Sequence, residues 1–139
     1  MGSMVQLQSG ALPYRIDDDG EIRVLLVTAS RTRRWTIPKG AAEPHLSLAE
    51  NAAKEAFEEA GVRGEVAPRA SGMFRAIKRR PEGESLIEVW VYLLKVTEIL
   101  EEWPEKHRRD VRWVSCSTAA ELLGEPVIRK ICAELKTAI

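Results

Sequence analysis

The chain has 139 residues, 45% of them hydrophobic and 30% charged, which predicts a single globular domain with a core of ordinary size. Lysine plus arginine and aspartate plus glutamate both number 21, so the net charge is zero and gives no indication of a nucleic-acid partner. No apolar run approaches the ~20 residues of a membrane span and no signal peptide is visible, so we expect a cytoplasmic protein without a membrane partner.

Residues 1–3 have the appearance of an expression remnant before Met4, and residues 4–139 are predicted to form one domain, monomeric or homodimeric. The first predicted element, Val5 to Ile16, is a strand interrupted by Gly10 and Pro13. A turn-forming Asp-Asp-Asp-Gly sequence joins it to Ile22–Thr28, whose continuous β-branched and aliphatic residues predict a central strand. The two strands are expected to form a hairpin.

A third, short strand is predicted at Trp35–Ile37, where Pro38 ends the strand and Gly40 permits unusual backbone angles. A helix is then predicted from Ser47 to Ala60. Ser-x-x-Glu at its start has the form of a capping box, and Gly61 stands where a helix-ending glycine is expected. Its alanines share a face centred near Ala53 and Ala60, which suits close packing on a sheet.

The second half of the chain is again rich in β patterns. One or two irregular strands are predicted over residues 62–77, a charged hairpin loop over residues 78–84 and a long strand over residues 86–96. After a polar connection and a short strand at residues 111–114, Thr118 and Gly124 bracket a short helix, and Pro126 begins a last helix that extends to Thr137. Cys116 and Cys132 have no metal-like spacing and are expected to be buried, reduced thiols.

Three carboxylates, Glu55, Glu58 and Glu59, are predicted to cluster on the helix opposite its alanine face. Like charges at this spacing destabilise a helix by roughly 0.2–0.5 kcal/mol per pair, and no structural gain offsets that cost. A cluster of like charges that destabilises its own helix indicates that these glutamates have a functional role. Oxygen ligands of this kind suit a hard divalent cation such as Mg²⁺ or Mn²⁺.

The residues Gly40-x5-Leu46-x7-Lys54-Glu55-Ala56-Phe57-Glu58-Glu59-Ala60-Gly61-Val62 resemble the Nudix box, Gly-x5-Glu-x7-Arg-Glu-U-x-Glu-Glu-x-Gly-U, where U is aliphatic. The surrounding segments, including Trp35 to Gly40 and Val96 to Trp103, resemble the branch that hydrolyses diphosphoinositol polyphosphates and dinucleoside polyphosphates. The resemblance implies an α/β (α+β) fold in which a mixed β-sheet is sandwiched between helices. It also implies a hydrolase that cleaves a phosphoanhydride bond of a small-molecule substrate.

The resemblance further implies roles for particular residues. Glu55 and Glu59 would ligate Mg²⁺ or Mn²⁺ together with a backbone carbonyl of Lys39 or Gly40, and Glu58 would be the general base or a further ligand. These three glutamates are the expected catalytic residues. Glu88, on a facing strand, is a possible extra ligand. Substrate phosphates are expected to bind Arg15, Ser30, Arg31, Arg33 and Lys39, because strand and loop ends near the box should line one cleft. Of these, Arg15 and Arg31 match positions where the branch contacts substrate, and Arg33 is inferred from charge alone.

Two departures from the family pattern qualify this expectation. Leu46 replaces a glutamate of the box, and Lys54 replaces an arginine that can form a bidentate fork. The alternative function is therefore a Nudix-fold nucleotide-binding or regulatory module with weak catalysis. Glu88 and Glu125 stand at positions that are basic in the animal members of the branch, which favours dinucleoside polyphosphates over the more anionic diphosphoinositol polyphosphates.

Overall fold

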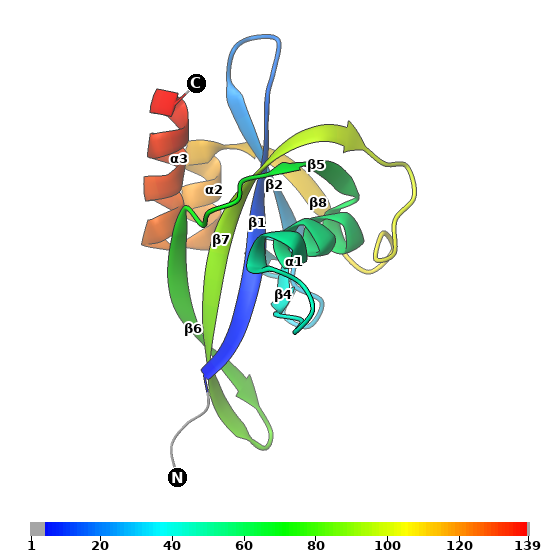
Figure 1. Ribbon diagram of the computed structural model, residues 1–139, viewed down its shortest axis with the longest axis vertical. Coiled ribbons are helices and arrows are strands. Elements are labelled where there is room, and N and C mark those ends of the chain that lie inside the picture. The colour runs from blue at the N-terminus through cyan, green and yellow to red at the C-terminus, as the bar shows by residue number, and fades with distance from the viewer. Residues whose placement is uncertain (1–4, 139) are drawn as a thin grey trace.

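A computed structural model describes residues 5–138, so the predicted expression remnant at residues 1–3 lies outside the described residues. A mixed eight-stranded sheet lies between helix α1 on one face and helices α2 and α3 on the other (Figure 1). The predicted fold class, a mixed sheet between helices, is confirmed. Within residues 5–138, no helix is both long and apolar enough to cross a membrane.

The sheet is organised around two long strands, β1 (Val5–Ile16) and β7 (Gly83–Ile99), which pair in parallel. The main path through the sheet is β3-β2-β1-β7-β5. The strands of this path besides β1 and β7 are β2 (Ile22–Thr28), β3 (Trp35–Thr36) and β5 (Val62–Val66). The predicted hairpin of β1 with β2 is confirmed, with Tyr14 opposite Val24.

Three further strands pair off this path. Strand β4 (Lys39–Ala41) pairs with β1, β6 (Gly72–Arg80) with β7, and β8 (Val111–Ser115) with β2, all antiparallel. The pairing of β4 with β1 places Gly40 directly opposite Ser9. This short pairing brings the loop before the helix against the middle of the sheet, and the candidate site forms there.

Strand β1 continues through Gly10 and Pro13, so the predicted interruption is wrong. Gly10 is required by close packing, because a Cβ atom there would lie 2.8 Å from Cδ1 of Ile37. The predicted loop over residues 78–84 is also wrong for most of its length. Backbone pairing of β6 with β7 continues to Arg80 and Gly83 and leaves a turn of two residues.

The predicted helix begins as expected but does not remain α-helical. Ser47 caps α1 (Leu48–Glu55), and both hydrogen bonds of the capping box are present. A π-helical turn, η1 (Ala56–Ala60), follows and ends at Gly61, whose φ of 68° lies in the left-handed region. Such wider turns occur frequently at functional sites.

The other two helices cover the opposite face of the sheet. Helix α2 (Cys116–Leu123) is capped by Ser115 and not by Thr118, because the Ser115 hydroxyl already accepts the Thr118 N–H, which places Thr118 inside the first turn. Helix α3 (Pro126–Ala138) begins at the predicted proline. Both cysteines are buried and free, as predicted.

Candidate active site

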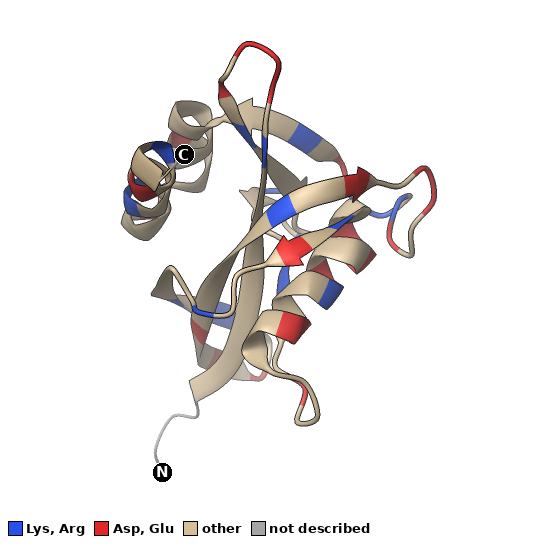
Figure 2. Ribbon diagram, turned by 45° about the horizontal axis from the view of Figure 1, so that its top comes forward, with Lys and Arg blue, Asp and Glu red and all other residues tan. Residues whose placement is uncertain are grey.

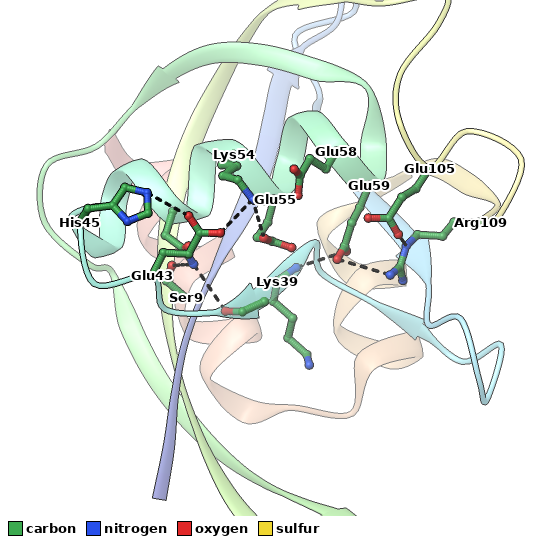
Figure 3. A network of polar contacts seen from close by, with 12 residues as sticks. Ser9, Lys39, Glu43, His45, Lys54, Glu55, Glu58, Glu59, Glu105 and Arg109 are labelled. Atoms are coloured by element: carbon green, nitrogen blue, oxygen red, sulfur yellow. Dashed lines mark hydrogen bonds and ion pairs between the residues drawn. The ribbon is translucent and has the colours of Figure 1, made fainter.

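The helix turns two of its three carboxylates toward the protein. Glu55 and Glu59 are 9% and 5% exposed, and the alanines buried beside them are Ala52, Ala56 and Ala60. The prediction that all three glutamates lie opposite the apolar face is therefore wrong for Glu55 and Glu59. Strand β4 lies against these two side chains, through the backbone of Lys39 and of Gly40, which periodicity within the helix cannot reveal (Figure 3).

Contacts with the chain around β4 hold the two buried carboxyl groups. A Cβ atom on Gly40 would lie 2.5 Å from the carboxyl carbon of Glu55, so only glycine permits this approach. The backbone N–H of Lys39 donates to Oε1 of Glu59 at 3.3 Å. Gly40 therefore shapes the site by having no side chain, and Lys39 contributes through its backbone as well as through its ammonium group.

Arg109 is a member of the site that sequence reasoning missed. Its guanidinium lies 3.4 Å from Oε2 of Glu59 and 2.9 Å from Oε1 of Glu105, and its Nη1 donates to the carbonyl of Thr28 (Figure 3). The connection after β7 reaches the helix because the N–H of Glu105 donates to the carbonyl of Glu58. The polar composition of residues 101–110 gave no indication that this connection returns to the helix.

Burial raises the pKa of the Glu59 carboxyl to about 8, and nearby Arg109 only partly offsets this effect. Burial also raises the pKa of the Glu55 carboxyl, with which Glu59 interacts directly. Burial lowers the pKa of the Lys39 ammonium, against the attraction of Glu59. The site thus holds two carboxyl groups whose joint ionisation is unfavourable unless a cation neutralises them.

Glu58 lies on the outer side of the helix, where Lys54 binds it. The Lys54 ammonium is 3.1 Å from Oε1 of Glu58, 3.3 Å from Oε1 of Glu43 and 3.9 Å from Oε2 of Glu55. These contacts raise the pKa of Lys54, chiefly through the hydrogen bond to Glu58. Lys54 therefore links the carboxylate of Glu43, in the loop before α1, to the helix. Leu46, in the same loop, occupies the position where the family pattern has a glutamate.

A cleft of about 860 Å³ opens beside Glu59. Its walls carry six cationic side chains, from the loop after β2, strand β4, strand β6 and the connection after β7: Arg31, Arg34, Lys39, Lys78, Arg79 and Arg109. No aromatic side chain is among the lining residues in the described part of the chain. Acidic residues along the helix and basic residues around it are seen together in Figure 2. The arrangement suits a phosphate-rich ligand bound next to a carboxylate pair.

The structure brings some of the predicted substrate contacts to this cleft and leaves others outside it. Ser30, Arg31 and Lys39 line the cleft. Arg15 instead lies over the ring of Trp113 and pairs with Asp17, and Arg33 pairs with Asp110. Lys78 and Arg79 line the cleft because strand β6 extends further than the sequence indicated.

Glu88, the possible extra ligand, faces away from the cleft. On β7 its neighbours Ile87 and Val89 belong to the core cluster under α2 and α3, and Ile87 lines the cleft. Successive side chains of a strand alternate between faces, which puts Glu88 on the face of α1. There it accepts a hydrogen bond from Trp90 at 2.9 Å and pairs with Arg75. The structure does not bring Glu88 to the other carboxylates.

The residues present fit a divalent cation in part. Two adjacent buried carboxyl groups with raised pKa values and a glycine that keeps its backbone against one of them form a compact set of oxygen atoms. Across residues 5–138, no three His, Cys, Asp or Glu side chains converge as a complete ligand cluster. Mg²⁺ commonly keeps several water ligands and binds through one or two carboxylates, so this partial set suits it.

A family model described as the NUDIX domain matches residues 7–135. The chain belongs to the Nudix family. It is 35% identical to Nudix hydrolase 12, mitochondrial, of Arabidopsis thaliana over 133 residues, which cover 84% of this chain and 66% of that protein. It is 34% identical to diphosphoinositol polyphosphate phosphohydrolase 2 of Rattus norvegicus over 134 residues, covering 93% of this chain and 70% of the relative. The chain spans about two thirds or less of the length of three Arabidopsis Nudix hydrolases that it matches, 12, 13 and 4.

Solved Nudix structures share the fold at low sequence identity. The Ap4A hydrolase of C. elegans has a TM-score of 0.66 and 19% identity, with 96% of this chain and 98% of that chain covered. The NUDIX domain of Shewanella oneidensis NrtR, solved with ADP ribose, has a TM-score of 0.69 and 16% identity, with coverage of 96% and 89%. At these identities the structures establish the architecture alone.

Proposed function

We propose that this protein is a divalent-metal-dependent hydrolase that cleaves a phosphoanhydride bond in a small, phosphate-rich substrate. The observation that carries the proposal is the buried pair Glu55 and Glu59, held against Gly40 at the side of a cleft whose walls carry six cations. Structural need alone does not account for two buried carboxyl groups with raised pKa values, and perturbed groups of this kind concentrate at functional sites.

Glu55, Glu59 and the backbone carbonyl of Gly40 would hold Mg²⁺ or Mn²⁺. When bound, such an ion neutralises phosphate charge and makes an attacking water more acidic. Arg109 holds the Glu59 carboxyl in place, and the Lys39 N–H fixes its second oxygen. Glu58 accepts the proton of the water or acts as a further ligand through its second oxygen, while Lys54 holds Oε1 of the same carboxylate.

The cations of the cleft bind the substrate phosphates. Ser30, Arg31 and Lys39 keep the role that the sequence predicts, and we add Arg34, Lys78, Arg79 and Arg109 because they line the same cleft. Arg15 and Arg33 are left out of this set because neither lines the cleft, and their guanidinium groups pair with Asp17 and Asp110.

The substrate expected from the sequence is a dinucleoside polyphosphate. The position of Glu88 in the structure weakens one argument for that substrate. Glu88 lies on the other face of the sheet, so its negative charge does not line the cleft. The described residues that line the cleft include six cations but no aromatic side chain on which a base could stack. This lining favours recognition of the substrate through its phosphate groups. A diphosphoinositol polyphosphate, the substrate type in the name of the Rattus norvegicus relative, is therefore the second candidate.

The test is product analysis with purified protein and either Mg²⁺ or Mn²⁺, across dinucleoside polyphosphates, diphosphoinositol polyphosphates, nucleoside diphosphate sugars and nucleoside triphosphates. Metal-dependent release of a phosphorylated product from one of these classes supports the proposal. Binding of the same compounds without turnover under either metal supports the alternative, a Nudix-fold binding or regulatory module.

A further inference from the structure

Asn51 carries a fully buried amide on the face of α1 that packs on the sheet. It is 0% exposed on α1, next to the buried alanines of the helix. Burying an amide is unfavourable unless its hydrogen bonds are satisfied, and Oδ1 of Asn51 has no partner among the described residues. The box pattern leaves this position unspecified, so neither the family resemblance nor periodicity identifies it.

The amide nitrogen joins the helix to the two strands beneath it. Nδ2 donates to Oγ of Ser9 at 2.9 Å and to the carbonyl oxygen of Gly40 at 3.4 Å. Ser9 and Gly40 are directly opposite one another in the pairing of β1 with β4. A carbonyl oxygen can only accept, so the contact with Gly40 decides which end of the amide faces the strands.

Asn51 also continues the row of site residues. Asn51, Glu55 and Glu59 follow one another at intervals of four residues, and all three are buried. The backbone of Gly40 is therefore fixed from two sides, by the carboxyl of Glu55 and by the amide of Asn51.

We propose that Asn51 is a positioning residue that holds the Gly40 carbonyl in the orientation required for metal binding. The inference rests on the metal-dependent activity proposed above. Groups that orient a metal ligand typically change metal affinity by 10–100-fold when they are removed. Leu46 leaves this site without one carboxylate of the family pattern, and Lys54 cannot form the bidentate fork of an arginine, so the backbone ligand depends more on Asn51.

Mn²⁺ binding, measured by titration calorimetry without substrate, tests this role in the whole chain. Asn51→Leu keeps the number and branching of the side-chain heavy atoms but removes the donor, and we expect Mn²⁺ affinity to fall by about 10–100-fold. The melting temperature should also fall, because the substitution leaves Oγ of Ser9 and the carbonyl of Gly40 without their donor, so Mn²⁺ affinity is the deciding measurement. A purely structural role for Asn51 predicts a lower melting temperature with unchanged Mn²⁺ affinity.

Two more variants keep the test decisive if Asn51→Leu does not fold. Asn51→Asp is isosteric and, when measured at a pH at which the new carboxylate is ionised, cannot donate to a carbonyl, so it should also weaken Mn²⁺ binding. Tighter binding by Asn51→Asp would instead make the side-chain oxygen a ligand and overturn the positioning role. Ser9→Ala keeps the bond to Gly40, and its Mn²⁺ affinity should stay within about threefold of the wild type.

The wild-type titration separates the two proposals. If the wild-type protein binds no Mn²⁺, the metal-dependent function is wrong, and the role of Asn51 with it. If the wild type binds Mn²⁺ and both Asn51 variants bind it equally well, only the inference about Asn51 is overturned.

Discussion

Gly40 and Glu55 are in such close contact that a Cβ atom on the glycine would lie 2.5 Å from the carboxyl carbon of the glutamate. Gly40→Ala should therefore displace the Glu55 carboxyl and lower turnover and Mn²⁺ affinity by about 10–100-fold. Steady-state kinetics and Mn²⁺ titration measure the two effects. Gly20→Ala is the control, because Gly20 has a φ of 82° in the β1–β2 turn and a methyl group added there would meet no atom within 4 Å. That variant should lose about 1 kcal/mol of stability and keep its Mn²⁺ affinity.

Glu59→Gln should abolish most hydrolysis while leaving the fold intact. The amide keeps an oxygen for the Lys39 N–H but loses the negative charge that would bind the metal. We expect turnover to fall by at least about 100-fold and Mn²⁺ binding to weaken in parallel. Circular dichroism checks the fold. Unchanged turnover would show that Glu59 does not belong to the metal site.

The stability of the metal-free protein should fall as pH rises from about 5 to about 9. The pKa of Glu59 in the folded protein, about 8, is above its usual value of 4.5, so the folded state holds a proton that the unfolded state has already released. This contribution to the free energy of unfolding is complete below pH 4.5 and is lost as pH passes 8. We expect the melting temperature to decline by on the order of 10 °C over this range.

Two comparisons test the assignment of this pH effect to Glu59. Glu59→Gln should flatten the profile, because no proton is released at that position. Mg²⁺ at millimolar concentration should stabilise the wild type more at pH 8.5 than at pH 5.5, because the metal competes with protons for the same carboxylates. A profile that is identical in the wild type and in Glu59→Gln would assign the effect to other groups.

Lys78 and Arg79 should affect substrate binding more than the chemical step. Both line the cleft, beyond the carboxylate pair, so Lys78→Ala and Arg79→Ala should raise KM with a smaller change in kcat. Each loss is expected to be about 3–30-fold in kcat/KM, decreasing as salt is added. Arg15→Ala is the matched control, because Arg15 pairs with Asp17 and packs on Trp113 outside the cleft. An equal loss in the control would mean that the substrate extends beyond this cleft.

Glu43→Gln should weaken the support that Lys54 provides to Glu58. The Glu43 carboxylate lies 3.3 Å from the ammonium of Lys54, which in turn binds Glu58. Because the lysine is partly exposed, the stability change should stay below about 1 kcal/mol, whereas kcat should fall by about 2–10-fold. Adding Leu46→Glu restores the family residue and should recover part of the loss. No recovery in the double variant would show that Glu43 does not compensate for Leu46.

The local features of the candidate site were predictable from the sequence. Ser47 and Glu50 form the expected capping box, Gly61 ends the helix in the left-handed conformation, and Pro126 begins the last helix. Capping, glycine conformations and proline restrictions depend on neighbouring residues, so a sequence pattern is sufficient to locate them. The glutamate spacing was informative for the same reason, and it identified the helix that carries the site.

Only the tertiary structure decided how these carboxylates are arranged and what surrounds them. The pairing of β1 with β4 covers Glu55 and Glu59, the connection after β7 delivers Arg109, and the length of β6 brings Lys78 and Arg79 to the cleft. The face of β7 on which Glu88 lies was fixed by the register of the sheet. These contacts join residues far apart in the chain. Strand register and burial determine the contacts, and no local sequence pattern encodes either of these. The sequence by itself therefore determined which helix carries the carboxylates, whereas long-range pairing determined which of them are buried and which cations face them.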